Sequence, residues 1–151
     1  FILEKQTLGT GGAILNAGVL NNIDDFVVIN ADTWIESGFQ ESFEAVIPSI
    51  LVTNVNNASR FGRVNLDSEN CVMSFDEKDG LETPGLINAG LFSLTREILE
   101  SVQQTKFSLE LEVLEPLVKA QNLQAIISNT NFFDIGVPED LNLFREYILN
   151  T

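Results

Sequence analysis

Apolar residues along the chain gather in short continuous runs separated by segments with a different spacing. Phe26–Ile29 and Ser49–Asn54 are typical of strands that are buried on both faces of a parallel sheet. Leu86–Leu94 predicts a further strand, interrupted at Asn88-Ala89-Gly90. Additional short strands are predicted at Phe1–Glu4, Ala125–Ile127 and Phe132–Ile135.

Between these runs, apolar residues recur every three or four positions, which is the spacing of a helix with one face on a core. Residues 13–23 and 39–47 have this pattern, and Pro48 ends the second helix. Three later helices are predicted to begin near Thr95, at Ser108 as N-cap, and at Pro138.

Residues 61–66 and 71–75 flank the polar segment Asp67–Asn70, and this arrangement predicts an antiparallel hairpin. Elsewhere strands and helices alternate along the chain. The whole pattern therefore predicts the α/β class, with a mainly parallel sheet, helices on both faces and an inserted antiparallel hairpin.

A length of 151 residues, 44% of them apolar, fits a single domain over 1–151 with a substantial core. No apolar run is long enough to span a bilayer and no secretory signal is recognisable, so no membrane partner is expected. The chain begins with Phe1 inside a predicted strand rather than with Met. We therefore expect it to start partway through a larger domain.

Charge and the rarest residue types exclude several functions. A formal charge of −14 is unsuited to binding nucleic acid. The absence of histidine excludes Ser-His-Asp and Cys-His catalysis within the chain, so any metal would be a hard ion such as Mg²⁺ or Mn²⁺ on carboxylates. Cys71, the single cysteine, excludes an internal disulfide framework and favours a cytoplasmic protein.

The first candidate site is Leu8-Gly9-Thr10-Gly11-Gly12-Ala13, at a predicted junction of strand and helix. Glycines there allow a ligand to approach the backbone closely, and the free N–H groups of a helix start attract anions. A purely structural turn is the alternative.

The second candidate is an acidic pair. Asp32 follows the strand Phe26–Ile29, and Asp134 lies in the segment Phe132–Gly136. A parallel sheet could bring both acids to the edge where ligands bind, and together they could hold Mg²⁺ against a nucleoside triphosphate. A helix cap at Asp32 and a turn residue at Asp134 are the structural alternatives.

The order of six motifs resembles the sugar-phosphate nucleotidyltransferase family, the NDP-sugar pyrophosphorylases. Within it, the chain is most similar to the heptose- and mannose-1-phosphate guanylyltransferases. The motifs are spread over nearly the whole chain, as Leu8–Ala13, Asn30-Ala31-Asp32, Phe61–Val64, Phe75–Lys78, Ile87–Gly90 and Asp134–Asp140.

The resemblance implies a Rossmann-like fold and the reaction of an NTP with a sugar 1-phosphate to give an NDP-sugar and pyrophosphate. GTP with D-glycero-D-manno-heptose 1-phosphate or mannose 1-phosphate is the substrate pair that it favours. It also implies a role for each matching residue. Asp32 and Asp134 would bind Mg²⁺; Leu8, Gly9, Gly11 and Gly12 would lie against base and ribose; Gly62, Glu77 and Asn88 would line the sugar pocket; and Lys78 would meet the sugar phosphate.

The sequence departs from the family in places. Ala31 and Val137 replace a common glycine and threonine, and nothing matches the family's arginine-bearing glycine loop that holds the triphosphate. We therefore expect the chain to be the C-terminal two-thirds of a catalytic domain, with little activity alone.

Structural alternatives remain for two of the implied sites. Glu77-Lys78 could be a solvated hairpin end, and Asn88-Ala89-Gly90 a strand bulge.

Two alternatives for the function also remain. A non-catalytic regulatory or assembly subunit would keep the fold and bind a sugar nucleotide without turnover. A glycosyltransferase of similar fold would usually have an Asp-x-Asp sequence, which the chain lacks. The base, the sugar and any homo-oligomer are left open by the sequence.

Overall fold

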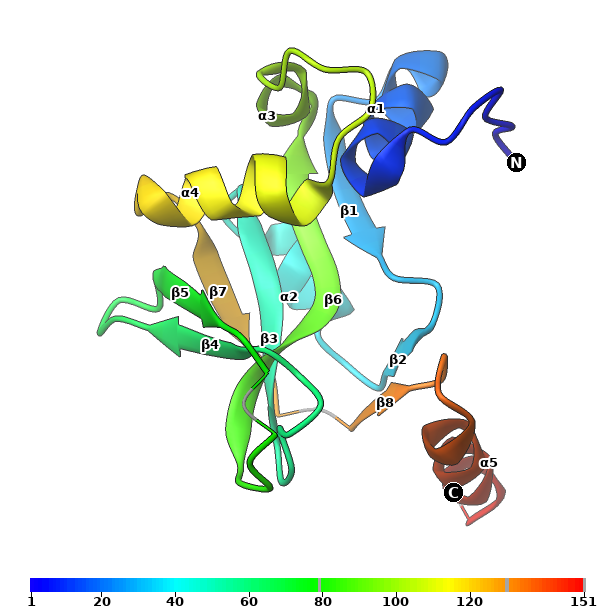
Figure 1. The fold of residues 1–151 in the computed structure, drawn as a ribbon, viewed down its shortest axis with the longest axis vertical. Helices are drawn as coiled ribbons and strands as arrows, with labels where there is room; N and C mark the ends of the chain where they lie inside the picture. The colour runs from blue at the N-terminus through cyan, green and yellow to red at the C-terminus, as the bar shows by residue number, and fades with distance from the viewer. Residues whose placement is uncertain (79, 130, 151) are drawn as a thin grey trace.

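The computed structural model describes residues 1–78, 80–129 and 131–150. Predictions that include Asp79, Thr130 or Thr151, such as the full 1–151 domain, lie partly outside the described residues. The centre of the molecule is a sheet (Figure 1), in which four strands lie in the order β1 (Asp25–Ile29), β6 (Gly85–Thr95), β3 (Ser49–Val55) and β7 (Gln124–Ile127).

The central sheet is mixed in direction. Strand β3 is parallel to β7, and β6 is antiparallel both to β3 and to β1, so β1, β3 and β7 share one direction. Parallel neighbours need a long crossover connection, usually a helix, whereas antiparallel neighbours do not. Strands β3 and β6 are antiparallel, and the segment between them forms a hairpin instead of a helix. The predicted α/β class is confirmed, and β6 is the strand that departs from a parallel arrangement.

The predicted hairpin is confirmed. It consists of β4 (Arg63–Leu66) and β5 (Val72–Asp76), which pair antiparallel. The Asp67 carboxylate accepts hydrogen bonds from the backbone N–H groups of Glu69 and Cys71, which fixes the tight turn.

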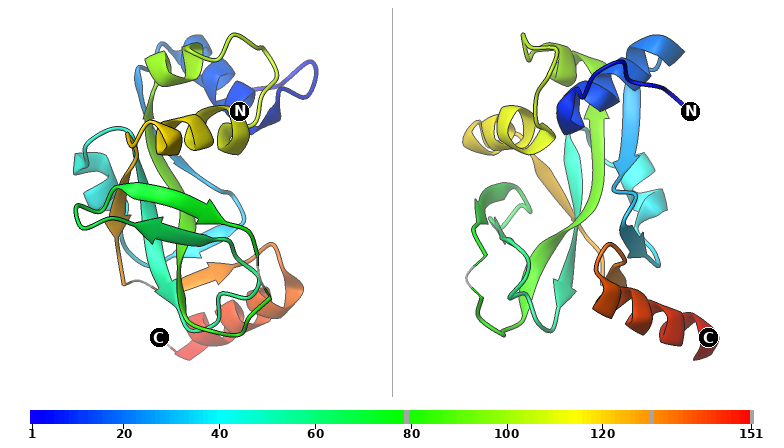
Figure 2. Two further views of the ribbon diagram at one scale, coloured as in Figure 1. Left: turned by 60° about the vertical axis from the view of Figure 1, so that its left-hand side comes forward. Right: turned by 45° about the vertical axis from the view of Figure 1, so that its right-hand side comes forward.

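Helices cover both faces of the sheet, as predicted (Figure 2). Helix α2 (Phe39–Glu44) lies on one face, against β3 and β6. The other face is covered by a group of helices: α1 (Gly9–Asn21), α3 (Arg96–Glu100), the π-helical turn η1 (Glu110–Leu114) and α4 (Glu115–Lys119).

Strand β3 separates two hydrophobic clusters. Ile50 and Val52 belong to the larger cluster beneath the helix group, whereas Leu51 points to the smaller cluster on the α2 side. All three are fully buried, which confirms the double burial predicted for this strand. The same prediction is wrong for Phe26–Ile29 in strand β1, where the three middle residues of the strand are half-buried and Ile29 is 42% exposed, because β1 lies at the edge of the sheet and, among the described strands, pairs only with β6.

The N-terminal segment differs from its prediction. Residues 1–8 form no strand, and Phe1 and Leu3 are exposed. A strand requires a neighbour to accept its hydrogen bonds, and none of the described strands pairs with this segment. Helix α1 begins at Gly9, so the glycine motif lies in its first turn. No helix in the described part of the chain is long and apolar enough to cross a membrane.

A separate two-stranded ladder joins β2 (Thr33–Ile35) to β8 (Phe132–Asp134), and helix α5 (Pro138–Asn150) packs beside it. An aromatic cluster holds these elements together, with ring centroids 5.0–5.7 Å apart, and its members are Trp34, Phe133, Phe144 and Tyr147. The Tyr147 hydroxyl donates a 2.8 Å hydrogen bond to the Glu36 carboxylate.

Tyr147 makes stability depend on pH at the alkaline end. The hydrogen bond to Glu36, with some burial, raises the pKa of Tyr147 above its usual value of 10.0. The unfolded chain therefore loses this proton first as the pH rises past about 10, and the folded state becomes less stable relative to it. Unfolding by urea across this range is expected to show a steeper loss of stability in the unsubstituted protein than in Tyr147→Phe. Identical pH profiles would contradict this.

Candidate functional site

The structure brings the two predicted acids together. Asp134 pairs with Thr33 in the β2–β8 ladder, so Asp32, one residue earlier, lies beside it. A Cβ placed on Gly136 would lie 3.1 Å from Asp32 Oδ2 and 3.3 Å from Asp134 Oδ1, so both carboxylates border the same point. The two meet through a short antiparallel ladder, rather than at the edge of a parallel sheet as the sequence suggested.

This pair has the right chemistry for a hard cation. Carboxylate oxygens suit Mg²⁺, which keeps several waters and takes other ligands from substrate phosphates. No group of three or more His, Cys, Asp or Glu that could hold a metal occurs among the described residues. A cation at Asp32 and Asp134 would therefore need further ligands from water and substrate.

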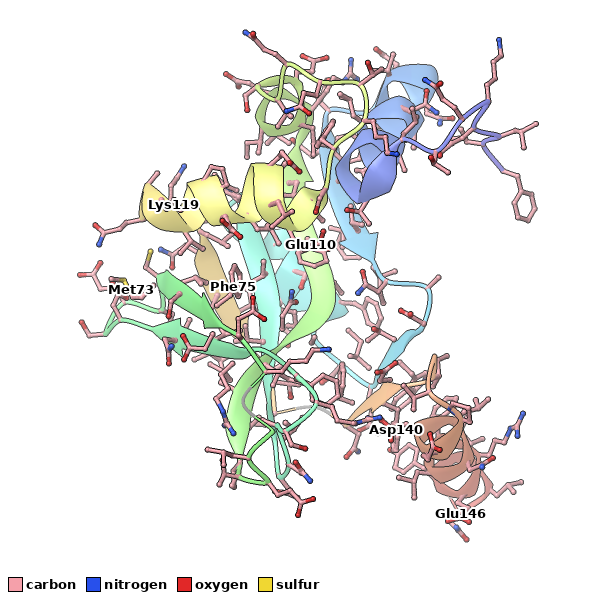
Figure 3. The ribbon with its side chains drawn as sticks, viewed as in Figure 1. Met73, Phe75, Glu110, Lys119, Asp140 and Glu146 are labelled. Carbon is pink, nitrogen blue, oxygen red and sulfur yellow. The ribbon has the colours of Figure 1, made fainter. Side chains whose placement is uncertain are left out.

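A cavity of about 590 Å³ contains all four residues predicted for the sugar end. They lie on the hairpin and β6, across from the η1–α4 segment. Figure 3 shows this arrangement, with Met73 and Phe75 on β5 facing the helical segment that bears Glu110 and Lys119. The four predicted residues are Gly62, Glu77, Lys78 and Asn88.

The bulge considered for Asn88-Ala89-Gly90 is present, and it connects the cavity to the acidic pair. The register between β3 and β6 shifts here, and Gly90 adopts a φ of +73°. The Asn88 side chain accepts a 2.9 Å hydrogen bond from the Gly90 N–H, and the Gly90 carbonyl accepts one of 2.9 Å from Asn30 N–H. Because Asn30 is two residues before Asp32, the bulge holds the acidic segment next to the cavity.

The hairpin end brings Glu77 and Lys78 to the cavity. Both are exposed and directly follow β5, so their side chains reach it from its solvent side. Gly62 allows the close approach, because a Cβ there would lie 2.8 Å from the Asp76 carbonyl oxygen. Glu77 and Lys78 can therefore lie at a solvated hairpin end and also bind a ligand in the cavity.

The glycine motif packs against protein. The N–H groups of Gly11 and Gly12 both donate to the Phe107 carbonyl, at 3.1 and 3.4 Å, and Phe107 N–H donates to the Leu8 carbonyl at 3.0 Å. A Cβ on Gly9 or Gly11 would collide with Phe107, and one on Gly12 would lie 2.6 Å from the Thr105 carbonyl oxygen. The expectation that these first-turn amides face an anion is wrong for Gly11 and Gly12. Gly9 borders a second, more open cavity of about 430 Å³.

Sequence reasoning missed Glu110. Its carboxylate lines both cavities and accepts hydrogen bonds from the hydroxyls of Thr10 and Ser108. The one signal in the sequence, an acid just after an N-cap serine, is equally typical of an ordinary helix start.

The fold and site define a class: a Rossmann-like α/β protein with paired carboxylates beside a cavity that contains a Glu-Lys dipeptide. A sequence model of the nucleotidyl transferase family matches residues 1–150. The chain belongs to this family.

Individual relatives agree with the family match. The chain is 35% identical to D-glycero-alpha-D-manno-heptose 1-phosphate guanylyltransferase of Campylobacter jejuni, over 99% of this chain and 66% of that protein. It is 32% identical to the bifunctional protein GlmU of Methanocaldococcus jannaschii, over 99% and 38%, and 29% identical to the mannose-1-phosphate guanylyltransferase catalytic subunit beta of Drosophila pseudoobscura, over 93% and 40%.

A solved structure is also similar. HddC from Yersinia pseudotuberculosis, complexed with GMP-PN, superposes with a TM-score of 0.84 and 34% identity, over 98% of this chain and 66% of that one. The chain thus spans less than two thirds of the length of each of these relatives.

The contact between Gly11 and Phe107 yields a stability prediction. In Gly11→Ala the added methyl overlaps the Phe107 ring, and overpacking of this kind costs about 1–3 kcal/mol of unfolding free energy. In a Phe107→Leu background the loss is expected to be smaller, because the ring edge is gone. Chemical unfolding of the four proteins in this double-mutant cycle measures the coupling. If the two substitutions change the unfolding free energy additively, the Phe107 ring is not what disfavours a larger residue at position 11.

Proposed function

We propose that the protein containing this chain is a sugar-1-phosphate nucleotidyltransferase that joins an NTP to a sugar 1-phosphate and releases pyrophosphate. The observation that supports this most is the position of Asp32 and Asp134, linked by the β6 bulge to a cavity bearing Glu77 and Lys78. GTP with D-glycero-D-manno-heptose 1-phosphate or mannose 1-phosphate is the favoured pair, supported by the guanylyltransferases to which the chain is similar.

The reaction needs positioning and charge neutralisation more than an activated side chain. A phosphate oxygen of the sugar 1-phosphate attacks the α-phosphorus of the NTP in line, a new P–O bond forms, and the bond to pyrophosphate breaks. No covalent enzyme intermediate is required, which suits a chain without histidine.

Each site residue then has a defined task. Asp32 and Asp134 would hold Mg²⁺, and the bound ion supplies positive charge that offsets the charge of the phosphates. Lys78 provides a point charge for the sugar phosphate. The remaining sugar contacts are hydroxyl hydrogen bonds to Glu77 and Asn88, with Gly62 leaving room for the ring.

The nucleotide is proposed to lie along Leu8, Gly9, Gly11 and Gly12. Base and ribose, rather than phosphate, are the parts proposed to lie there, because the Gly11 and Gly12 amides already donate to Phe107 and are not available to phosphate oxygens. The main phosphate contacts are proposed to come from residues that precede Phe1, with this chain forming the C-terminal two-thirds of the catalytic domain.

The proposal includes a cytoplasmic location, supported by the free, buried thiol of Cys71.

The activity is tested with the full-length gene product. Purified protein with Mg²⁺ is incubated with GTP, UTP, dTTP or CTP and with each of several sugar 1-phosphates, and pyrophosphate release is measured. We expect turnover with GTP and heptose or mannose 1-phosphate. If no pair reacts, while calorimetry detects binding of a sugar nucleotide, the protein is instead a non-catalytic binding subunit.

The acidic pair is tested separately. Asp32→Asn and Asp134→Asn each remove one of the two charges proposed to hold the cation, and each is expected to lower kcat about 100-fold or more. Asp24→Asn is the matched control, because Asp24, immediately before β1, is an exposed aspartate paired with Arg96. Full activity in either site variant would exclude a metal site built on both carboxylates.

A further inference from the structure

We propose that Glu110 is a sugar-binding residue, and that its free carboxylate oxygen accepts a hydrogen bond from a hydroxyl of the bound sugar. This inference rests on the proposed function, because it assigns a contact within the same reaction. It places a second acceptor on the wall of the cavity opposite Glu77.

The carboxylate of Glu110 is held in place from two sides. The Thr10 hydroxyl donates to Oε2 at 3.1 Å and the Ser108 hydroxyl donates to the same oxygen at 2.7 Å. Thr10 is itself fixed, since its hydroxyl oxygen accepts a 2.8 Å hydrogen bond from Leu109 N–H. A side chain restrained in this way loses little further freedom when a ligand binds.

The other carboxylate oxygen has no partner. Neither hydrogen bond of the Glu110 carboxylate involves Oε1, and no described residue approaches that atom as a donor. Glu110 lines the 590 Å³ cavity from the helical side, with Phe75 on the strand across from it (Figure 3). It also begins the π-helical turn η1, a distortion that is frequent at functional sites.

The charges of the cavity identify which part of the substrate Glu110 contacts. The described lining includes the acids Asp76, Glu77, Glu110 and Glu115 against two lysines. Lys119 is paired with Glu115 at 3.2 Å, which leaves Lys78 as the cation for the sugar phosphate. A phosphate next to Glu110 would be repelled, whereas an uncharged hydroxyl would donate to it. The cavity thus favours a sugar whose only phosphate lies at the Lys78 end.

An ordinary helix cap does not account for these contacts. At this helix start, Ser108 performs the capping, because its hydroxyl oxygen accepts from Glu110 N–H and Leu111 N–H at 3.2 and 3.3 Å. Glu112 completes the cap by accepting from Ser108 N–H at 2.7 Å. The Glu110 carboxylate is therefore not needed for any backbone group.

Steady-state kinetics of the full-length protein test the assignment. Glu110→Gln keeps the shape of the side chain and removes its charge, and it is expected to raise KM for the sugar 1-phosphate about tenfold while KM for GTP changes less than about twofold. Thr10→Val, which removes one of the hydroxyls that hold Glu110, is expected to raise the same constant by a smaller factor. Thermal unfolding of each variant shows whether it is folded.

Glu115→Gln is the matched control, since it removes an equal charge from the same cavity at a residue paired with Lys119. Equal KM effects of Glu110→Gln and Glu115→Gln would overturn the inference in favour of a general charge effect. An unchanged sugar KM in Glu110→Gln, or in Thr10→Val if the first variant does not fold, would overturn it and leave the proposed function intact. No turnover in the unsubstituted protein would overturn the proposed function itself, and the inference with it.

Discussion

Strand β6 pairs with β3 along one edge and with both β1 and β4 along the other, and the positions of the functional residues depend on this sharing. Strand β1 pairs with residues Leu91–Thr95 of β6, whereas β4 pairs with β6 at Ile87. The bulge at Asn88–Gly90 lies between these two pairings, where the strand changes register. One side of the bulge opens on the large cavity and the other bonds to Asn30. A straight β6 would separate the cavity from the acidic segment.

Glycine permits close approach at each of the junctions around the site. At Gly90 a Cβ would lie 2.9 Å from the side-chain nitrogen Nδ2 of Asn30, and at Gly136 it would intrude between the two carboxylates. Gly11 plays the same part where α1 meets Phe107. These positions bring together elements from opposite ends of the chain, because backbone can contact backbone or side chain without an intervening Cβ. The acidic residues can then lie close together although the chain has a charge of −14.

Much of this arrangement could be predicted from the sequence, because continuous apolar runs and helix-capping residues are local signals. Ser108 at a helix start, the hairpin turn at Asp67–Asn70 and the strand Ser49–Asn54 were all predicted in this way. The direction of β6 could not be, since apolar content does not depend on the direction of a neighbouring strand. The bonding of the glycine amides to Phe107, nearly a hundred residues away, has no local signal, and neither has the contact of Glu110 with Thr10. The resemblance of the motif order to that of the nucleotidyltransferase family indicated which residues form the site. The β2–β8 ladder explains how two of them, Asp32 and Asp134, come to lie side by side.

The aromatic cluster between the β2–β8 ladder and α5 contains a fluorescent residue close to the acidic pair. Trp34 is the only tryptophan of the chain; it follows Asp32 by two residues, and its ring lies 5.7 Å from that of Phe133, the residue before Asp134. The indole therefore lies on the same two strand ends as the carboxylates. Any cation or nucleotide that draws these strand ends together alters the surroundings of this ring. We therefore expect the fluorescence of Trp34 to change if a cation binds at the proposed site, so that binding could be followed in this chain without labels and without turnover.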